Sequence, residues 1–357
     1  MKNIETDIRS EKKLRIAVFA DLHYKKGMYI ASVQDLKDIL ARANESGVDF
    51  IIHAGDMSND YSRSRELTDA YLKNPYGLAV YGVYGNHELE SKDNSMQVVT
   101  PLLTNREVVW GTADGRIGDG SIAYYYTDIQ GFRIVGLDTN YSWNPEAEEW
   151  QHNQTRSWCE PAGNTASNSL GTVQLEWLEG VLNDAAEQGI SCLLFSHRGF
   201  SGVWKSSPDT DAVQELIRHA NAKRQGTVLM SISGDLHSDH QKLIEDVVHF
   251  DVNTVRNGVW RGTPLEHYDR QTYRFTAYDA EGNEIESYDR PISETSMAKH
   301  TWYFADPLSA IVDVCTNGEI SIEGMESSWY EDVSPDAPWV HTGITDGHYE
   351  PFSKRSK

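Results

Sequence analysis

Five short stretches of the chain place side chains that can bind metal ions directly after apolar runs. They are ADLH (20–23), GD (55–56), GNHE (85–88), SH (196–197) and GDLH (234–237). Their polar members are carboxylates, imidazoles and one amide without any thiolate, which disfavours soft metals and iron–sulfur clusters. One carboxylate can bridge two cations roughly 3.5–4 Å apart, the separation typical of two-metal hydrolases. Such a pair of cations can bind a phosphate oxygen, activate water and stabilise the charge that develops on phosphorus.

Each stretch taken alone has a plainer explanation. Gly and Asp are common turn residues, and a single Asp-x-His after a strand is usually a turn with a solvated imidazole. GNHE is the most specific of the five, although Asn and Gly also form turns. The joint pattern favours a site, because all five stretches close an apolar run and such a series is hard to obtain by chance.

The apolar runs alternate with amphipathic segments in the first half of the chain. The patterns predict strands at 14–21, 48–56 and 77–86, and helices at 32–47 and 63–72. Strand, helix, strand, helix, strand is typical of a layered α/β sheet. Ligand sites in such sheets form at the carboxyl ends of the strands, so we expect the five stretches to meet there.

The second half of the chain is richer in β signals. We predict a hairpin at 122–138, a helix at 172–189, strands at 191–197, 227–235 and 246–255, and hairpins at 272–289 and 309–324. The segment 139–170 is predicted to be a long polar and aromatic loop, and long loops in compact domains are often functional. Its aromatic residues either cap the site and stack on a substrate or pack against the β-rich C-terminal part. They are Tyr141, Trp143, Trp150 and Trp158.

The charge of the chain limits the partners. It has 32 basic and 54 acidic residues among 357, a formal net charge of −22. Such a surface repels polyphosphate backbones, so nucleic acid polymers are not expected as partners. A small anionic substrate is still compatible, because bound metal ions reverse the local field.

The cysteines and the N-terminus bear on the compartment. Cys159, Cys192 and Cys315 are far apart and odd in number, which favours a reducing environment over a disulfide framework. The first 14 residues are charged and unlike a signal peptide, and no apolar run is long enough for a membrane span. We therefore expect a cytoplasmic protein with no membrane partner.

In this order, the motifs resemble those of the calcineurin-like metallophosphoesterases, over residues 21–237. The resemblance implies an α/β fold of two sheets in a four-layer sandwich, with a dinuclear metal centre at the strand ends. A β-rich C-terminal extension would follow. The implied boundaries are a tail at 1–13, a domain at 14–325 with insertions at about 139–170 and 256–305, and a tail at 326–357.

The resemblance also assigns roles to individual residues. Asp21, His23 and His237 would hold the first metal, Asp56 would bridge both metals, and Asn86 and His197 would hold the second. His87 would face the phosphate as a general acid or charge stabiliser, which suits an imidazole near neutral pH. Gly55, Gly85 and Gly234 would permit the tight turns that aim these ligands.

One position departs from the family pattern. The family usually has G-H-x-H where this chain has Gly234–His237, so Asp235 stands in the place of a histidine ligand of the second metal. A carboxylate there favours Mn²⁺, Mg²⁺ or Fe²⁺ over a zinc-type site. It could instead leave the second metal weak or absent. His240 is then either a replacement ligand or a surface residue.

Three further positions complete the prediction. Asn59 stands where purple acid phosphatases carry a tyrosine ligand, so a tyrosinate–Fe(III) centre is not expected. His53 ends an apolar strand and is predicted to be a core residue. Arg198 either touches a phosphate or forms a surface salt bridge, and the sequence does not separate these alternatives.

Together these observations predict metal-dependent hydrolysis of a small phosphodiester or phosphomonoester by a metal-activated water. Two divalent ions are expected, Mn, Fe or Zn, with Mn favoured by the oxygen-rich second site. The alternative is a non-catalytic protein-binding module on the same fold. A nuclease is disfavoured by the charge, and the substrate, the native metals and the oligomeric state are left open.

Overall fold

The structure is a computed structural model. It describes residues 13–24, 31–58, 65–88, 103–111, 123–145, 148–152, 168–203, 206–260, 272–278, 284–291, 301–325, 327 and 355–356. Asn59 and Trp158, named above, lie outside these residues, and so does most of the two predicted tails.

Two large mixed sheets form the centre of the fold. The first has the order β19-β18-β17-β1-β2-β3 and the second has the order β11-β12-β10-β9-β6-β5-β4. The strands of the first are β1 (Lys13–Phe19), β2 (Phe50–His53), β3 (Ala79–Gly82), β17 (Ala310–Cys315), β18 (Ile320–Gly324) and β19 (Arg355–Ser356). Those of the second are β4 (Val109–Trp110), β5 (Tyr125–Ile129), β6 (Phe132–Leu137), β9 (Ser191–Ser196), β10 (Val228–Ser233), β11 (His240–Ile244) and β12 (Val247–Asp251).

Three small antiparallel pairs and the helices complete the described elements. The pairs are β7 (Tyr141–Asn144) with β8 (Glu149–His152), β13 (Asn257–Trp260) with β16 (Thr301–Tyr303), and β14 (Thr272–Tyr278) with β15 (Glu284–Pro291). The helices are α1 (Val33–Glu45), α2 (Arg65–Leu72), α4 (Thr172–Gln188) and α5 (Thr210–Lys223).

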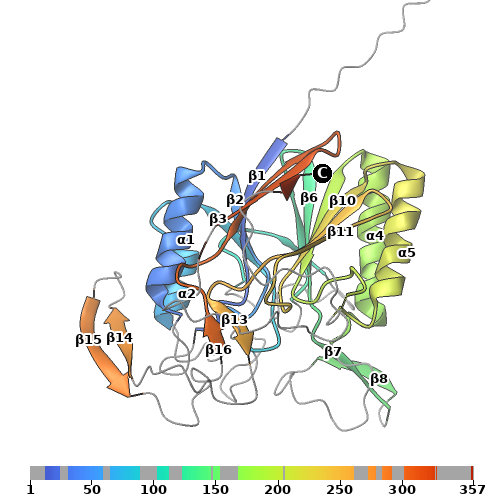
Figure 1. The fold of residues 1–357 in the computed structure, drawn as a ribbon. Coiled ribbons are helices and arrows are strands. Elements are labelled where there is room, and N and C mark those ends of the chain that lie inside the picture. Colours follow the sequence, from blue (N-terminus) through green and yellow to red (C-terminus); the bar gives the residue numbers. More distant parts are fainter. Residues whose placement is uncertain are drawn as a thin grey trace, which may run out of the picture.

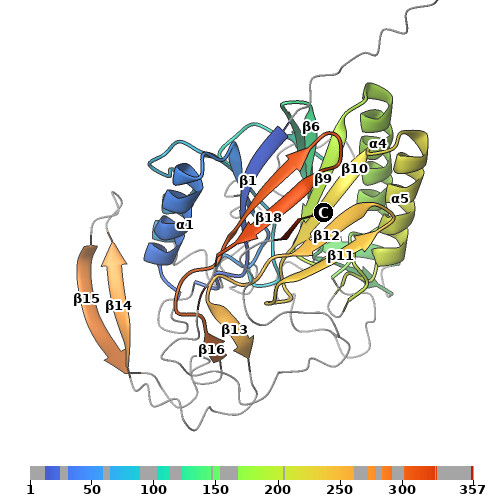
Figure 2. The same cartoon turned by 45° about the horizontal axis from the view of Figure 1, so that its top comes forward.

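The layers follow from the two-residue period of the strands. Leu14, Ile16 and Val18 of β1 point into a core cluster between the sheets, while Ala17 and Phe19 point into a second cluster beneath α1 and α2. A third cluster joins the second sheet to α4 and α5. Figures 1 and 2 show the resulting order of helices, sheet, sheet and helices. Because both faces of β1 are buried, its sequence is a continuous apolar run rather than an alternating one.

The predicted fold class is confirmed, with differences in detail. The strands are shorter than predicted, because the polar residues that close each apolar run already lie in loops. Helix α5 was not predicted, although Val213, Leu216, Ile217 and Ala220 recur at the i, i+3, i+4, i+7 spacing of an amphipathic helix. The predicted loop 139–170 contains the hairpin β7–β8, so describing it as loop throughout was wrong.

The strand directions place the candidate residues. β1, β2 and β3 run parallel in the first sheet, and β6, β9, β10 and β12 run parallel in the second. In each sheet the carboxyl ends of the parallel strands therefore share one edge, where the residues that follow β1, β2, β3, β9 and β10 emerge.

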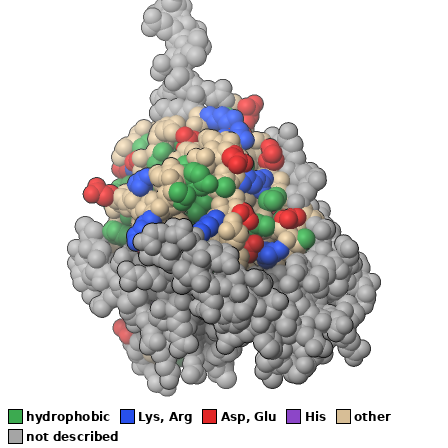
Figure 3. All heavy atoms as spheres, turned by 90° about the vertical axis from the view of Figure 1, so that its left-hand side faces the viewer, with side chains coloured by type: hydrophobic (Ala, Val, Ile, Leu, Met, Phe, Trp, Pro, Cys, Tyr) green, Lys and Arg blue, Asp and Glu red, His purple; other side chains and the backbone are tan. Residues whose placement is uncertain are grey.

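The surface on the α1 side carries mixed charges. In Figure 3 the described residues of this face include basic, acidic and a few hydrophobic side chains, and no histidine is in view. None of the helices in the described ranges is long and apolar enough to cross a membrane.

His53, at the end of β2, is a core residue as predicted. It is 1% exposed, and its ring lies 4.9 Å from that of Phe19 and 6.0 Å from that of Tyr71, between centroids. Burial lowers the pKa of His53 to about 3, so the folded protein keeps this imidazole neutral in weak acid.

His53 predicts a pH dependence of stability. The unfolded chain binds a proton here near pH 6.5, whereas the folded chain does so only near pH 3, so the free energy of unfolding falls as the pH drops through this window. The contribution reaches at most about 1.4 kcal/mol per pH unit. We expect His53→Phe to lose less stability than the wild type between pH 6.5 and 4.5 in denaturant titrations. His219→Gln, which removes an exposed imidazole from α5, should retain the wild-type slope. Equal slopes for all three proteins would contradict a neutral, buried His53.

Candidate metal centre

All eight predicted site residues lie at the shared carboxyl edge of the two sheets. The loops after β1, β2 and β3 carry Asp21, His23, Asp56, Asn86 and His87, and those after β9 and β10 carry His197, Asp235 and His237. Six of them are buried, while the side chains of His87 and His237 are each 23% exposed. The site therefore has a buried floor and opens at these two imidazoles.

Backbone hydrogen bonds continue the pairing of β1 and β2 beyond their ends. The N–H groups of Asp21 and His23 donate to the carbonyl oxygens of Gly55 and Asp56, at 3.0 and 2.8 Å. These bonds fix the loop after β1 against the loop after β2, and so fix three candidate ligands relative to one another.

Two further bonds join the sheets. The backbone N–H of Asp235 donates to Oδ2 of Asp21 at 3.0 Å. Nδ1 of His197 lies 2.8 Å from the carbonyl oxygen of Ala54, and because a carbonyl only accepts, this nitrogen carries the hydrogen. Nε2 of His197 is thereby directed at the other site residues, as the remote hydrogen bond of a metal-binding histidine usually arranges.

One group of candidate ligands gathers around Asp21. Its Oδ1 lies 3.2 Å from Nε2 of His237 and 3.7 Å from Nε2 of His23, and the two imidazole nitrogens are 3.0 Å apart. Three donor atoms from the loops after β1 and β10 thus converge on a single point, and these are the residues that the resemblance assigns to the first metal.

A second group gathers around Oδ2 of Asp56. This oxygen lies 3.2 Å from Nε2 of His197, and that nitrogen lies 3.2 Å from Oδ1 of Asn86. The same oxygen lies 3.6 Å from Nε2 of His23, in the first group. Oδ1 of Asp56 is occupied by the backbone N–H of His87 at 2.8 Å, so Oδ2 is the oxygen that faces both groups.

The backbone at these ligands is unusual. Asp21, His23, Asp56, Asp235 and His237 all have positive φ, between 50° and 61°. The left-handed conformation costs a residue other than glycine roughly 1–2 kcal/mol. Five such residues at one edge indicate that the surrounding bonds hold the loops in strained conformations, which is typical of functional sites.

Opposite charges shape the electrostatics of the cluster. Burial alone would raise the pKa values of Asp21 and Asp56, but the neighbouring imidazoles, chiefly His237 for Asp21 and His197 for Asp56, hold both pKa values well below their usual range. Burial opposes protonation of His197, but Asp56 and its neighbours raise the pKa of His197 to about 10. The pocket thus stabilises positive charge strongly, which is what a cation site requires.

Glu88 supports these ligands without joining them. It is fully buried, and its carboxylate accepts hydrogen bonds from the backbone N–H groups of Asp56 at 2.9 Å, Met57 at 2.6 Å and also Gly85. It therefore ties the loop after β2 to the loop after β3. Burial and the charge of Asp56 raise the pKa of Glu88 to about 7. In the sequence Glu88 is the last residue of GNHE, and its role was not predicted.

Glycines allow the close approach of these loops. Gly55 has a φ of 91°, and a Cβ there would lie 2.5 Å from Nδ1 of His197. A Cβ on Gly85 would lie 2.0 Å from Oδ1 of Asp56. At Gly55 a glycine is required both by the left-handed backbone and by the lack of space for a Cβ. At Gly85 the lack of space requires it, in place of the predicted tight turn.

Asp235 and Arg198 lie near the second group, whereas His240 differs from expectation. Oδ1 of Asp235 lies 3.6 Å from Nε2 of His197, while its Oδ2 lies 3.2 Å from Nε of Arg198. His240 is fully buried and pairs through Nδ1 with Asp251 at 2.9 Å, so it is neither a surface residue nor a replacement ligand here.

The aromatic hairpin β7–β8 contacts the start of α4. The rings of Trp143 and Trp150 lie 5.7 Å apart, and Nε1 of Trp150 donates to Oγ1 of Thr172 at 2.9 Å. His152, to which the sequence analysis gave no role, lies 2.7 Å from Oδ2 of Asp138 at the end of β6. Figure 1 places the hairpin at the end of the molecule opposite the start of β1. Stacking of these rings on a substrate stays a prediction.

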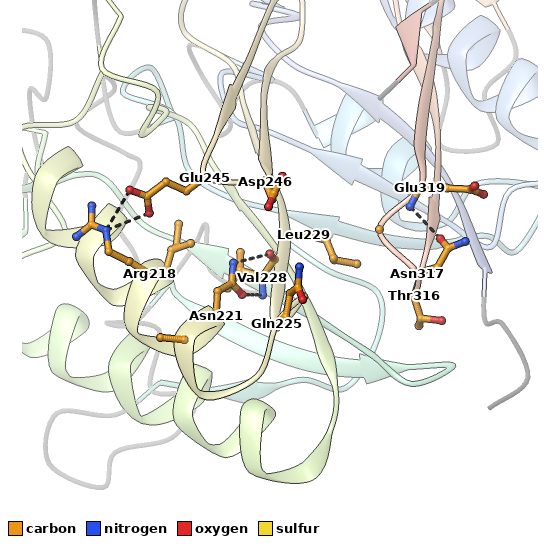
Figure 4. A pocket seen from close by; sticks show the side chains of 14 residues that line it. Arg218, Asn221, Gln225, Val228, Leu229, Glu245, Asp246, Thr316, Asn317 and Glu319 are labelled. Carbon is orange, nitrogen blue, oxygen red and sulfur yellow. Dashed lines mark hydrogen bonds and ion pairs between the residues drawn. The ribbon is translucent and has the colours of Figure 1, made fainter. Parts of the chain in front are cut away.

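A groove of about 780 Å³ lies elsewhere, between α5 and the turn that joins β17 to β18 (Figure 4). Val228, Glu245 and Asn317 are among its lining residues. Val228 begins β10 and Glu245 precedes β12, so the groove lies at the amino edge of the second sheet. None of the eight site residues lines it, and we do not assign the chemistry to it.

The donor set fits divalent metal ions. Three groups have donor atoms that all lie within 4.8 Å of one another: Asp21, His23 and His237; Asp21, Asp56 and His197; and His23, Asp56 and His87. Buried carboxylate and imidazole donors that converge in this way suit Mn²⁺, Fe²⁺ or Zn²⁺. Asp21, His23 and Asp56 each belong to two of these three groups.

Comparison with known proteins gives three findings. A family model for calcineurin-like phosphoesterases matches residues 14–239. A manganese-dependent ADP-ribose/CDP-alcohol diphosphatase from Danio rerio is 24% identical over 203 residues, which cover 49% of this chain and 63% of that protein, less than two thirds of its length. The crystal structure of a dimetal phosphatase from Danio rerio aligns with a TM-score of 0.51 and 16% identity, covering 88% of this chain and 98% of that one. The structural likeness supports the sandwich fold.

Glu88 predicts an effect on metal affinity. Glu88→Gln places an amide NH₂ against backbone N–H donors, so the two ligand loops should separate slightly. We expect the dissociation constant for Mn²⁺, measured by titration calorimetry, to rise about 10- to 100-fold, as for other residues that orient ligands. Glu187→Gln, exposed on α4, is the matched control. Unchanged Mn²⁺ affinity in a folded Glu88→Gln protein would show that the loops hold without this carboxylate.

Proposed function

Because the chain belongs to the calcineurin-like phosphoesterase family, we propose that it hydrolyses a small phosphodiester or phosphomonoester at a dinuclear metal site. The observation that carries the proposal is the position of Asp56. Its Oδ2 lies 3.6 Å from Nε2 of His23 and 3.2 Å from Nε2 of His197, so one carboxylate oxygen faces both groups of donors.

The ligands in this proposal are those predicted from the sequence. Asp21, His23 and His237 hold one ion, Asn86, His197 and Asp235 the other, and Asp56 is shared. When bound, two such ions supply Lewis acidity to the phosphoryl oxygens and lower the pKa of the attacking water. The oxygen-rich second group favours Mn²⁺, and the relative from Danio rerio is named as manganese-dependent.

His87 is the proposed proton donor to the leaving group. Its side chain is partly exposed at the mouth of the site, and its Nε2 lies 3.8 Å from Oδ2 of Asp56. Its ring stands edge-on to that of His23, with centroids 4.8 Å apart. Its backbone N–H is anchored on Oδ1 of Asp56, so the ring is held beside the shared carboxylate. His87 also forms a candidate donor group with His23 and Asp56, but we assign it the role of proton donor.

A diester is the favoured substrate class within this proposal. The Danio rerio relative is named for ADP-ribose and CDP-alcohols, compounds in which each phosphorus has two bridging oxygens. Monoesters stay in the proposal, because the described contacts do not exclude a terminal phosphate. The net charge of −22 supports small phosphoesters over nucleic acid polymers, and a cytoplasmic setting without a membrane partner is part of the same proposal.

Asp56→Asn tests the shared carboxylate. The amide keeps the shape but loses the charge that two cations require, so turnover should fall by at least about 10³-fold, beyond the effect of losing a single electrostatic contact. Circular dichroism should show an intact fold, and metal content should fall below two ions per chain. Asp211→Asn, exposed on α5, should behave as wild type. Full activity in Asp56→Asn would contradict the two-metal mechanism.

A substrate panel tests the activity itself. Hydrolysis of bis(p-nitrophenyl) phosphate, p-nitrophenyl phosphate and ADP-ribose should occur in Mn²⁺ and stop in EDTA, with the two diester-type compounds turned over faster. Faster turnover of p-nitrophenyl phosphate would move the substrate class to monoesters. No turnover in a protein that also binds no metal would favour the alternative of a protein-binding module.

A further inference from the structure

The contacts of Asp235 lead to a side chain that the proposed function has not used. We propose that Arg198 binds substrate: its guanidinium, positioned by Asp235, donates to a non-bridging oxygen of the phosphoryl group at the second metal. The inference rests on the proposed function, and it names Arg198 as a substrate-binding residue and Asp235 as both a ligand and a positioning residue.

A short series of contacts connects Arg198 to the shared carboxylate. Oδ2 of Asp56 lies 3.2 Å from Nε2 of His197, which lies 3.6 Å from Oδ1 of Asp235. The other oxygen of Asp235 lies 3.2 Å from Nε of Arg198. Asp235 therefore presents one oxygen to the second group of donors and the other to the guanidinium, so Arg198 lies next to that group.

The pair is held in place from both sides. The backbone N–H of Asp235 is bonded to Asp21, and the backbone N–H of Arg198 lies 3.4 Å from Oγ1 of Thr139. The carbonyl oxygen of Arg198 accepts a hydrogen bond from Oγ of Ser196 at 2.7 Å. Because the backbone of both residues is fixed, pairing Asp235 with the guanidinium costs little additional conformational entropy.

The pair is unlike a surface salt bridge. The side chain of Asp235 is only 6% exposed and that of Arg198 is 23% exposed. Nε of Arg198 and Oδ2 of Asp235 are both buried and form an ion pair without hydrogen-bond geometry. Exposed ion pairs contribute little to stability. A buried charge such as that of Asp235, in contrast, is costly unless an opposite charge lies beside it. The remaining exposure of Arg198 belongs to side-chain atoms other than Nε.

The guanidinium has donors to spare. It carries five N–H groups, and one ion pair with a single carboxylate oxygen leaves several for a ligand. A planar fork of donors matches the tetrahedral oxygens of a phosphate, and such bonds are stronger than those between neutral groups. In the part of the chain that the structure describes, Asp235 is the one acidic group paired with Arg198.

Charge balance gives an independent reason. A carboxylate at position 235 takes one unit of positive charge from the site relative to a neutral imidazole, which weakens its attraction for an anionic substrate. The Arg198 guanidinium beside it restores that unit. The two residues therefore act together. Asp235 adds an oxygen ligand to the second group, and Arg198 restores the positive charge that attracts the anionic substrate.

Phosphate binding measures this role directly. Mn²⁺-loaded wild type, Arg198→Gln, Arg198→Lys and the control Arg218→Gln would be titrated with inorganic phosphate by calorimetry, after their metal content is determined. Arg218 lies on α5, where it pairs with Glu245 at the amino edge of the second sheet, far from the site. We expect Arg198→Gln to weaken phosphate binding about 10- to 100-fold, the loss of a charged hydrogen bond, while it keeps the wild-type Mn²⁺ content. Arg198→Lys should recover part of the affinity, and Arg218→Gln all of it.

Steady-state kinetics with bis(p-nitrophenyl) phosphate give the second readout. Arg198→Gln should raise KM more than it lowers kcat, because Arg198 binds the ground state and the transition state alike. Asp235→Asn with Arg198→Gln should hold less Mn²⁺ and bind phosphate more weakly than Arg198→Gln alone, since Asp235 is also a proposed ligand of the second metal.

The outcomes separate the two proposals. If the wild type binds phosphate but turns over no substrate, the proposed function fails and the Arg198 comparison still stands. Unchanged phosphate affinity and KM in Arg198→Gln would overturn the inference while leaving the function intact. Loss of Mn²⁺ from Arg198→Gln would also overturn it, because Arg198 would then serve only to hold Asp235 for the metal. Failure of Mn²⁺-loaded wild type to bind phosphate would overturn both.

Discussion

Three carboxylates, those of Asp21, Asp56 and Asp235, are buried at one edge of the sandwich, and this burial is the constraint on which the rest of the site depends. A buried carboxylate is costly unless positive charge or hydrogen-bond donors face it. Imidazoles, backbone N–H groups and Arg198 supply that compensation from both sheets. The same buried carboxylates also stabilise cations in the pocket. Their burial is therefore both what makes the site costly to form and what allows it to bind metal ions.

The fold makes this arrangement possible by holding short loops rigidly. The strands that precede the site are buried on both faces, and the pairing of β1 with β2 continues into their loops. Glu88 fastens the next loop to these, and the bond from Asp235 to Asp21 fastens one sheet to the other. Left-handed backbone conformations at five of the ligands persist because so many independent contacts determine them.

Much of this site could be predicted from the sequence, because its signals are local. Asp21, His23, Asp56 and His197 each follow an apolar run, and parallel strands bring such ends together. What could not be predicted depends on tertiary contacts. The role of Glu88 follows from where backbone N–H groups point, and the pairing of Arg198 with Asp235 follows from the neighbouring positions of β9 and β10. The hairpin β7–β8 was missed because its short strands have few buried residues, whereas the apolar residues of helix α5 follow the helical spacing and could have predicted it.

The central claim is that Asp56 is shared between two metal ions, and anomalous diffraction tests it most directly. Crystals grown with Mn²⁺ would be measured on both sides of the manganese absorption edge. Two anomalous peaks, roughly 3.5–4 Å apart with Oδ2 of Asp56 between them, are the result that the account predicts. A single peak, or two peaks of which only one contacts Asp56, would contradict it.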